Sequence, residues 1–289
     1  YRILIGQRLY SSWSLRGWLC FDAFGIPCDI ETVEIYSEGF ANRVEDFAGG
    51  VSVPAAITPE GGCLTDTMAI AWHLAGAFSD RGLLPDAPVD RAMAQSMIAE
   101  MHSGFTALRR TCPMDLSRAW RGFLPPADVR ADLDRIERLW ARALARSGGP
   151  FLFGAYTLAD AFFAPVAARI AGFGIEVSPL SQGYVAAHLG HGAFRRWRAE
   201  GLAENRLLSV YDQPFEAGPF PAPAPIAARK VDAGPSENDV CPYCRKPVSH
   251  FMEMDGKVWG FCNAHCRDKT LADPEAWPAF ARIAGLETR

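Results

Sequence analysis

Two groups of residues have types and spacing that could support chemistry. The first is a serine-rich stretch, Tyr10–Ser14, which lies between a short apolar run and an amphipathic segment. A hydroxyl at the start of a helix can donate a hydrogen bond to an anion, and the positive end of the helix dipole adds to the stabilisation. The second group is four cysteines near the end of the sequence: Cys241, Cys244, Cys262 and Cys266.

The four cysteines form two close pairs with the spacing of metal ligands. Cys241 and Cys244 are separated from Cys262 and Cys266 by seventeen residues, so both pairs can converge on one tetrahedral Zn²⁺. Four thiolates leave no open coordination position, which predicts a structural site in a treble-clef or zinc-ribbon module. We interpret His265, between the last two cysteines, as a non-ligand. Asp255 and Gly256 predict a hairpin turn in this module. Its small core is expected to consist of Trp259, Phe261, Trp277 and Phe280. The opening residues lack the apolar core of a signal peptide, so the sequence predicts a cytoplasmic protein, and in a reducing compartment close cysteine pairs are metal ligands before they are disulfides.

The elements before residue 82 predict an α/β, thioredoxin-like domain that positions the serines. An apolar strand, Arg2–Gly6, is followed by an amphipathic helix that ends at Gly25. Alternating residues predict a second strand over Asp29–Tyr36, and two short apolar runs around the turn Pro59–Gly62 predict a hairpin. An apolar helix follows. The order is β-α-β and then β-β-α.

In the next segment, 88–211, the hydrophobic residues recur only with helical spacing, which predicts an all-α domain. Residues 212–238 are rich in proline and alanine and predict an extended linker, and 239–289 form the proposed zinc module. The expected helices of the all-α domain are Arg91–Leu108, Asp128–Arg146, Leu158–Ala171 and Phe194–Glu204. Thr157 and Asp160 have the spacing of a capping box at the start of the third helix. His102 and Arg109 share one helix face, which could line a second-substrate pocket.

Composition argues against several classes of partner. The formal net charge is −4, and residues 239–289 hold seven basic and seven acidic residues, so nucleic acid is an unlikely partner. No stretch reaches the roughly 18 apolar residues that a membrane-spanning helix needs, and the first residues do not have the pattern of a signal peptide.

Four motifs, in this order, resemble bacterial glutathione S-transferases of the serine type related to the zeta class (maleylacetoacetate isomerase). They are YSSWSLRGWL, SVPAAI, LTDTMAIAWHL and AEMHSGFTALRRTCPMDL. The resemblance covers residues 1–211. It implies a glutathione-transferase fold, glutathione as co-substrate, a small electrophile as second substrate and a homodimer.

The resemblance also implies roles for individual residues. Ser11 matches the catalytic serine that activates the glutathione thiol, with Ser12 and Ser14 as alternatives. Val53 and Pro54 match a cis-proline dipeptide whose backbone pairs with the cysteinyl part of glutathione. Asp66 and Thr67 match the acidic and hydroxyl pair that holds the γ-glutamyl end.

Two positions depart from the family pattern. Relatives usually carry a basic residue where this sequence has Ser52, and Glu is commoner than Asp at position 66. Arg43 could supply the missing charge from a neighbouring loop. The main hypothesis is a glutathione S-transferase-like enzyme that conjugates or isomerises a small electrophile. The alternative is a non-catalytic adaptor of the same fold whose zinc module docks a partner. The sequence does not identify the electrophile.

Overall fold

A computed structural model of the chain describes residues 1–286, which pack into two compact units. Unit 1 consists of residues 1–189 and 208–221. Unit 2 consists of residues 190–207 and, within the described part of the chain, residues 222–286. Among residues 1–286, the helices are all too short or too polar to cross a bilayer.

Unit 1 begins with a thioredoxin-like sheet of order β2-β1-β3-β4. Strand β1 pairs in parallel with β2 and antiparallel with β3, and β3 forms the predicted hairpin with β4. The strands are β1 (Arg2–Ile5), β2 (Asp29–Thr32), β3 (Ala55–Ile57) and β4 (Cys63–Leu64), and the helices are α1 (Ser12–Asp22), α2 (Phe40–Ala48) and α3 (Thr67–Ala77).

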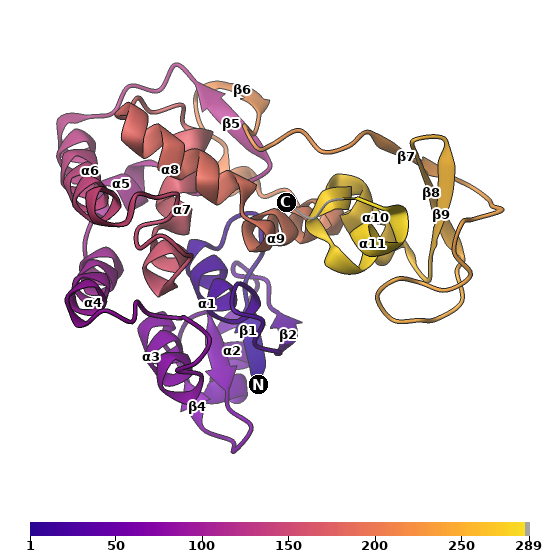
Figure 1. Cartoon of the computed structure of the whole chain (residues 1–289), viewed down its shortest axis with the longest axis horizontal. Helices are drawn as coiled ribbons and strands as arrows, with labels where there is room; N and C mark the ends of the chain where they lie inside the picture. Colours follow the sequence, from indigo (N-terminus) through magenta and orange to yellow (C-terminus); the bar gives the residue numbers. More distant parts are fainter. Residues whose placement is uncertain (287–289) are drawn as a thin grey trace. The chain divides into compact units, whose positions relative to one another are not determined.

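The side-chain alternation of β1 places helices on both faces of this sheet. Leu4 packs with Val44 and Phe47 of α2 on one face. On the other face, Ile3 lies beside Gly17 of α1, and α1 in turn packs against α3. Figure 1 shows α1 and α3 side by side near the sheet. The first helix and the hairpin were predicted correctly, whereas α2 was not predicted.

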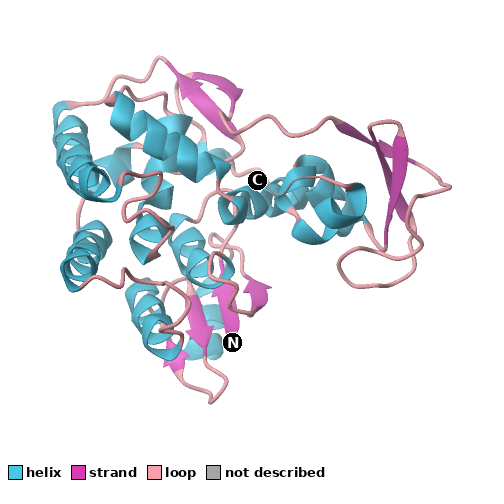
Figure 2. Ribbon diagram, in the orientation of Figure 1, coloured by secondary structure: helices cyan, strands magenta, loops and turns pink. Residues whose placement is uncertain are grey.

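The second part of unit 1 is helical, as predicted, and Figure 2 shows the contrast with the strand-containing first part. One short ladder accompanies the helices, formed by β5 (Arg118–Arg121) and β6 (Glu216–Pro219). A short 3-10 turn, Ser209–Tyr211, precedes β6. The helices are α4 (Pro88–Ser103), α5 (Thr106–Thr111), α6 (Ala127–Ser147), α7 (Leu158–Gly172) and α8 (Pro179–Gly190).

The prediction of one helix over Arg91–Leu108 was wrong, because the chain breaks between α4 and α5. Gly104 is extended, and a Cβ there would lie 2.7 Å from the carbonyl oxygen of Glu100. Phe105 then adopts a left-handed conformation with φ of 55°. The hydrophobic periodicity continues across this break, so the pattern alone did not reveal it. The helix α8 was also not predicted.

Helix α7 is the buried centre of unit 1 and packs against α1 and α4. Its N-terminus carries the predicted capping box. The Thr157 backbone N–H donates to Oδ2 of Asp160 at 2.8 Å, and Oδ1 of Asp160 accepts from the backbone N–H of Leu152 and the hydroxyl of Tyr184. These bonds fix the start of a helix that brings Arg169 close to α1.

Unit 2 combines helix α9 (Gly192–Glu204) with a three-stranded sheet of order β7-β8-β9 and a helical C-terminal segment. Ala199 of α9 joins a hydrophobic cluster that includes the predicted module core of Trp259, Phe261, Trp277 and Phe280. The remaining elements are β7 (Ala228–Val231), β8 (His250–Met254), β9 (Lys257–Phe261), α10 (Ala264–Ala272), a 3-10 turn at Pro274–Ala276 and α11 (Pro278–Ala284).

Two features of this division differ from the expected segments. The range expected to be a linker, 212–238, contains β6, which pairs within unit 1, and β7, which pairs with β8 in unit 2. Helix α9, expected within the all-α domain, groups with unit 2. The strand expected over Asp29–Tyr36 ends at Thr32, which pairs with Ile5, the last residue of β1.

Candidate functional site

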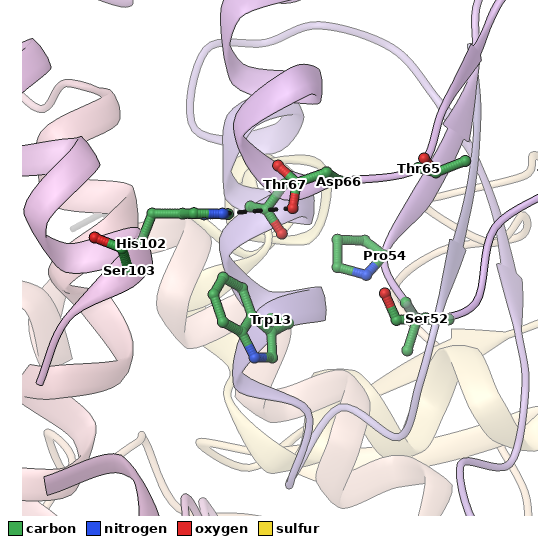
Figure 3. A pocket seen from close by; sticks show the side chains of 9 residues that line it. Trp13, Ser52, Pro54, Thr65, Asp66, Thr67, His102 and Ser103 are labelled. Atoms are coloured by element: carbon green, nitrogen blue, oxygen red, sulfur yellow. Dashed lines mark ion pairs between the residues drawn. The ribbon is translucent and has the colours of Figure 1, made fainter. Parts of the chain in front are cut away.

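A cavity of about 360 Å³ in unit 1 brings several predicted site residues together. Figure 3 shows its walls, which come from α1, from the loop before β3, and from the N-terminus of α3 and the C-terminal end of α4. The lining residues are Trp13, Ser52, Val53, Pro54, Thr65, Asp66, Thr67, His102 and Ser103. Of the predicted glutathione-binding set, Val53, Pro54, Asp66 and Thr67 line this cavity, whereas Ser11 does not, and neither does its neighbour Ser12.

The acidic wall of the cavity is the N-terminus of α3. Oδ1 of Asp66 accepts from the backbone N–H groups of Met68 at 2.7 Å and Ala69 at 3.3 Å, so Asp66 is the N-cap. Its Oδ2 lies 3.5 Å from Nε2 of His102, the ion pair drawn in Figure 3. Thr67 is 2% exposed. The helix start offers a positive dipole end beside a carboxylate, which suits a ligand that carries both an amine and a carboxylate.

The opposite wall is Trp13, whose indole ring lies 5.2 Å from the ring of His102 in an edge-to-face arrangement. The guanidinium carbons of Arg16 and Arg109 lie 4.6 Å and 4.5 Å from the centre of the Trp13 ring. Two positively charged side chains, one from α1 and one from α5, therefore lie against the Trp13 ring.

The loop before β3 carries a cis peptide bond between Val53 and Pro54, as the resemblance predicted. The proline ring packs directly against α1, because a Cβ at Gly17 would lie 2.5 Å from Cγ of Pro54. This close approach requires glycine at position 17. It fixes the distance between α1 and the loop that lines the cavity.

Ser11 lies at the N-cap of α1, where its side chain is used within the protein. Its Oγ accepts from the backbone N–H of Ser14 at 3.3 Å and donates to Oγ of Ser14 at 2.8 Å. Ser14 in turn accepts from the backbone N–H of Gly6 at 2.9 Å. Ser11 is 7% exposed, and Ser14 is fully buried. This geometry gives Ser11 a capping role.

Ser12, the next residue, is half-buried and differs from Ser11 in its partner. Its Oγ accepts from Nη2 of Arg169, on α7, at 3.2 Å. Burial lowers the pKa of Arg169 to about 10, and repulsion from Arg109 adds to this effect, but the guanidinium remains protonated at neutral pH.

The two positions that depart from the family pattern differ in location. Ser52 lines the cavity and adds no charge to it. Arg43 forms an ion pair with Glu31 and lies over the ring of Phe47, with 5.5 Å between its guanidinium carbon and the ring centre. Arg43 is absent from the cavity lining, so the idea that it replaces the missing cation gains no support.

A separate group of sulfur atoms lies in unit 2. The Sγ atoms of Cys241, Cys244 and Cys262 are all within 4.8 Å of one another, and Sγ of Cys266 lies 3.8 Å from that of Cys262. Burial raises the pKa of Cys241, but backbone hydrogen bonds from Cys244, Cys262 and Tyr243 outweigh it and lower the pKa to about 7. Backbone donors around a sulfur favour the thiolate, the form that binds metals.

Three of the sulfurs, those of Cys241, Cys244 and Cys262, lie close enough together to suggest a metal site, with 3.1 Å between Cys244 and Cys262. Zn–S bonds of about 2.3 Å require sulfur separations of about 3.8 Å. Asn263 caps α10 by accepting from the backbone N–H of Cys266 at 2.8 Å, which fixes the start of the helix that carries this cysteine. His265 points its Nε2 at Glu200 instead, at 2.7 Å. All four cysteines are free thiols rather than disulfides.

A thioredoxin-like sheet followed by a helical domain, with a cavity between a cis-proline loop and two helix N-termini, defines the glutathione-transferase fold. Residues 10–77 match the family model described as Glutathione S-transferase, N-terminal domain. No curated protein sequence matches the chain significantly.

Solved structures support the same fold over about 70% of the chain. A glutathione transferase homologue from Burkholderia GL BGR1, solved with bound glutathione, is similar with a TM-score of 0.54 and 19% identity over 70% of this chain and 97% of that one. Glutathione transferase Omega 2S from Trametes versicolor has a TM-score of 0.52 and 21% identity over 73% and 99%. A bacterial zeta-class maleylpyruvate isomerase has a TM-score of 0.50 and 20% identity over 68% and 96%.

Sequence reasoning missed two contributors to the site. Trp13 lies within the serine stretch that was singled out, and its position one residue after Ser12 could have indicated exposure beside the helix start. Arg169 lies 157 residues from Ser12 and only the packing of α7 on α1 brings them together. His102 was considered for the second-substrate pocket but not placed in the glutathione site.

Proposed function

We propose that this protein is a glutathione S-transferase-like enzyme that activates the glutathione thiol for conjugation or isomerisation of a small electrophile. The observation that carries the proposal is the shared cavity of Val53, Pro54, Asp66 and Thr67 beside the start of α1. The family match over residues 10–77 supports the same assignment.

Each wall of the cavity suits one part of the tripeptide. The Val53 backbone would pair with the cysteinyl backbone in the manner of an added strand. Oδ2 of Asp66 would accept from the γ-glutamyl amine, while the N-terminal N–H groups of α3 and the Thr67 hydroxyl would bind its carboxylate. His102 already lies 3.5 Å from Oδ2 of Asp66 and limits the space there.

The sulfur of a tripeptide bound in this way would lie near the start of α1. A hydroxyl donor and the positive helix end would stabilise the thiolate, with the thiol proton released to water, and the thiolate would then attack the electrophilic carbon. The resemblance assigns this hydroxyl to Ser11, and Ser12 is the alternative that the hydrogen bonds favour. A homodimer in the cytoplasm completes the proposal.

We further propose that residues 239–289 are a zinc module in which Cys241, Cys244, Cys262 and Cys266 hold one structural Zn²⁺. The close group of Cys241, Cys244 and Cys262, with Cys266 3.8 Å from Cys262, supports this assignment. The ion would organise the start of α10 and the turn that contains Cys241 and Cys244, and it has no open position for substrate. The domain division at 1–82, 88–211, 212–238 and 239–289 stays part of the proposal.

Retention on glutathione resin and titration calorimetry with glutathione test the enzymatic function. The native protein should bind, and Asp66→Ala should bind at least about tenfold more weakly, because a charge-assisted bond to the γ-glutamyl amine is lost. Asp134→Ala, on the exposed face of α6, is the matched control. Conjugation of an activated chloronitroarene should then fall in Ser11→Ala or Ser12→Ala. A native protein that fails to bind glutathione would refute the proposal.

The second candidate is a non-catalytic adaptor with the same fold. Ser52 in place of a basic residue, and the engagement of Asp66 by both the helix cap and His102, favour this reading. It predicts no glutathione binding but one equivalent of zinc. Metal analysis after gentle purification tests the zinc site alone, and less than about half an equivalent per chain would contradict it.

A further inference from the structure

The two serines at the start of α1 differ in which of their hydrogen-bonding groups are already used. The hydroxyl proton of Ser11 is donated to Ser14, and its oxygen accepts from the Ser14 backbone. The oxygen of Ser12 accepts from Arg169, whereas its proton has no acceptor within residues 1–286. Ser12 is also the more exposed of the two. An O–H group that is held through its oxygen and has a free proton is preorganised to donate.

Arg169 is held rigidly in position to orient Ser12. The residue is 5% exposed, and its Nε donates to the carbonyl oxygen of Cys112 at 2.8 Å, while Nη1 donates to that of Pro165 at 3.2 Å. The third nitrogen, Nη2, remains for Ser12. Because α7 is anchored by its capping box and buried along its length, the guanidinium can hold one geometry.

The neighbourhood of Arg169 carries excess positive charge. Arg16, Arg109 and Arg169 have no carboxylate within ion-pair distance among residues 1–286. Arg16 is fully buried, donates from Nε to the carbonyl oxygen of Phe162, and has no partner in that range for either terminal nitrogen. Buried charges are normally paired, so three unpaired guanidinium groups beside one helix start favour an anion there.

We propose that Ser12 is the hydroxyl that donates to the glutathione sulfur, and that Arg169 is the positioning residue that orients Ser12 and supplies positive charge to the thiolate. This inference rests on the proposed function and assigns the thiol contact to a different residue from the one that the resemblance implies. In the step itself, the S–H bond breaks, the proton passes to water, and the electron pair stays on sulfur. Ser12 keeps its own proton and donates a hydrogen bond.

The groups around Arg169 come from four segments. Arg109 of α5 repels it, Cys112 and Tyr211 are the neighbouring titratable groups, and Arg16 lies on α1. Burial raises the pKa of Cys112 to about 12, and burial together with Tyr36 raises the pKa of Tyr211. Both remain neutral below pH 9, so the positive charge is constant across the range in which a bound thiol would titrate.

The test is the pH dependence of thiolate absorbance in the complex of the full-length protein with glutathione. Ser12→Ala should raise the apparent pKa of the bound thiol by about one unit and lower kcat about tenfold at neutral pH, with a small change in KM. Arg169→Lys, which keeps the charge but cannot make three directed bonds, should give a smaller rise than Arg169→Met. Ser96→Ala and Arg138→Met, both on exposed helix faces, are the matched controls.

The outcomes separate the two claims. A thiol pKa that is unchanged in Ser12→Ala but raised in Ser11→Ala would overturn the inference and leave the proposed function intact. Failure of the native protein to bind glutathione would instead refute the proposed function. If Arg169→Met does not fold, Ser12→Ala decides the matter, because this half-buried side chain makes a single hydrogen bond and its loss leaves the core unchanged.

Discussion

Replacement of Arg195 tests whether α9 belongs to the folding unit of the cysteine module. Arg195 is 4% exposed and donates to Asp273 from Nε at 2.8 Å and from Nη2 at 2.6 Å, and to Glu275 from Nη2 at 3.2 Å. The side chains of the two acids are only 11% and 10% exposed. Arg195→Met would remove the cation that donates hydrogen bonds to both of these nearly buried carboxylates.

Removal of one partner from a buried ion pair costs about 3–5 kcal/mol, mainly because the remaining charge stays desolvated. For a unit of this size, that loss lowers Tm by more than about 10 °C. Hydrogen exchange of the backbone amides in β8 and β9 measures the stability of unit 2 itself. The protection factors of these amides should fall by about two orders of magnitude or more at 25 °C. Arg229→Met, which removes an exposed pair with Glu253, should cost at most about 1 kcal/mol.

A triple variant sharpens this test. Arg195→Met combined with Asp273→Asn and Glu275→Gln removes the uncompensated charge and should recover most of the lost protection. Equal loss of protection in the single and triple variants would show that packing, rather than charge, dominates. Native-like protection in Arg195→Met would refute the reasoning altogether.

Two further predictions concern unit 1. Burial raises the pKa of Asp160 from 3.8 to about 6, so the native state binds this proton more tightly than the unfolded chain. The contribution of Asp160 to stability is therefore full below about pH 4 and falls by about 3 kcal/mol as pH rises through 6. Urea midpoints across this range should show the decline, and Asp160→Asn should remove it. Gly17→Ala should weaken glutathione binding at least about tenfold in calorimetry, because its Cβ would lie 2.5 Å from Pro54 Cγ, whereas Gly183→Ala, with open space, should bind normally.

Much of the fold could be predicted because the relevant signals are local. The buried stripe of α6, the capping box at Thr157 and Asp160, and the turn at Asp255 and Gly256 between β8 and β9 are all read from adjacent residues. The break at Gly104 was missed because hydrophobic spacing continues across it and the decisive contact is with the Glu100 carbonyl. Helix α2 was missed because its short apolar face, Val44 and Phe47, is completed only by the sheet.

In the candidate site, too, local motifs could be predicted from the sequence, whereas contacts between distant segments could not. The residues that were predicted from motif order, Val53, Pro54, Asp66 and Thr67, line one cavity because each follows or precedes a fixed element of the sheet. The choice between Ser11 and Ser12 was not accessible from sequence. It depends on which oxygen meets Arg169, and that contact joins α1 to the far end of a helix whose own position is set by its capping box.

Unit 2 changes how the C-terminal cysteines should be understood. About fifty residues bury too little apolar surface to fold stably by themselves, and small domains of this size often gain the missing stability from a bound metal ion. Here α9 contributes as well: Ala199 fills part of the hydrophobic cluster, Arg195 neutralises two buried acids, and Glu200 binds both Lys269 and His265. The ammonium of Lys269 also lies 4.1 Å from the ring centre of Trp277. These contacts join residues 190–207 to the segment beyond 222, so the cysteine segment contributes to the burial of α9. Its role is therefore structural within unit 2 before any partner is considered.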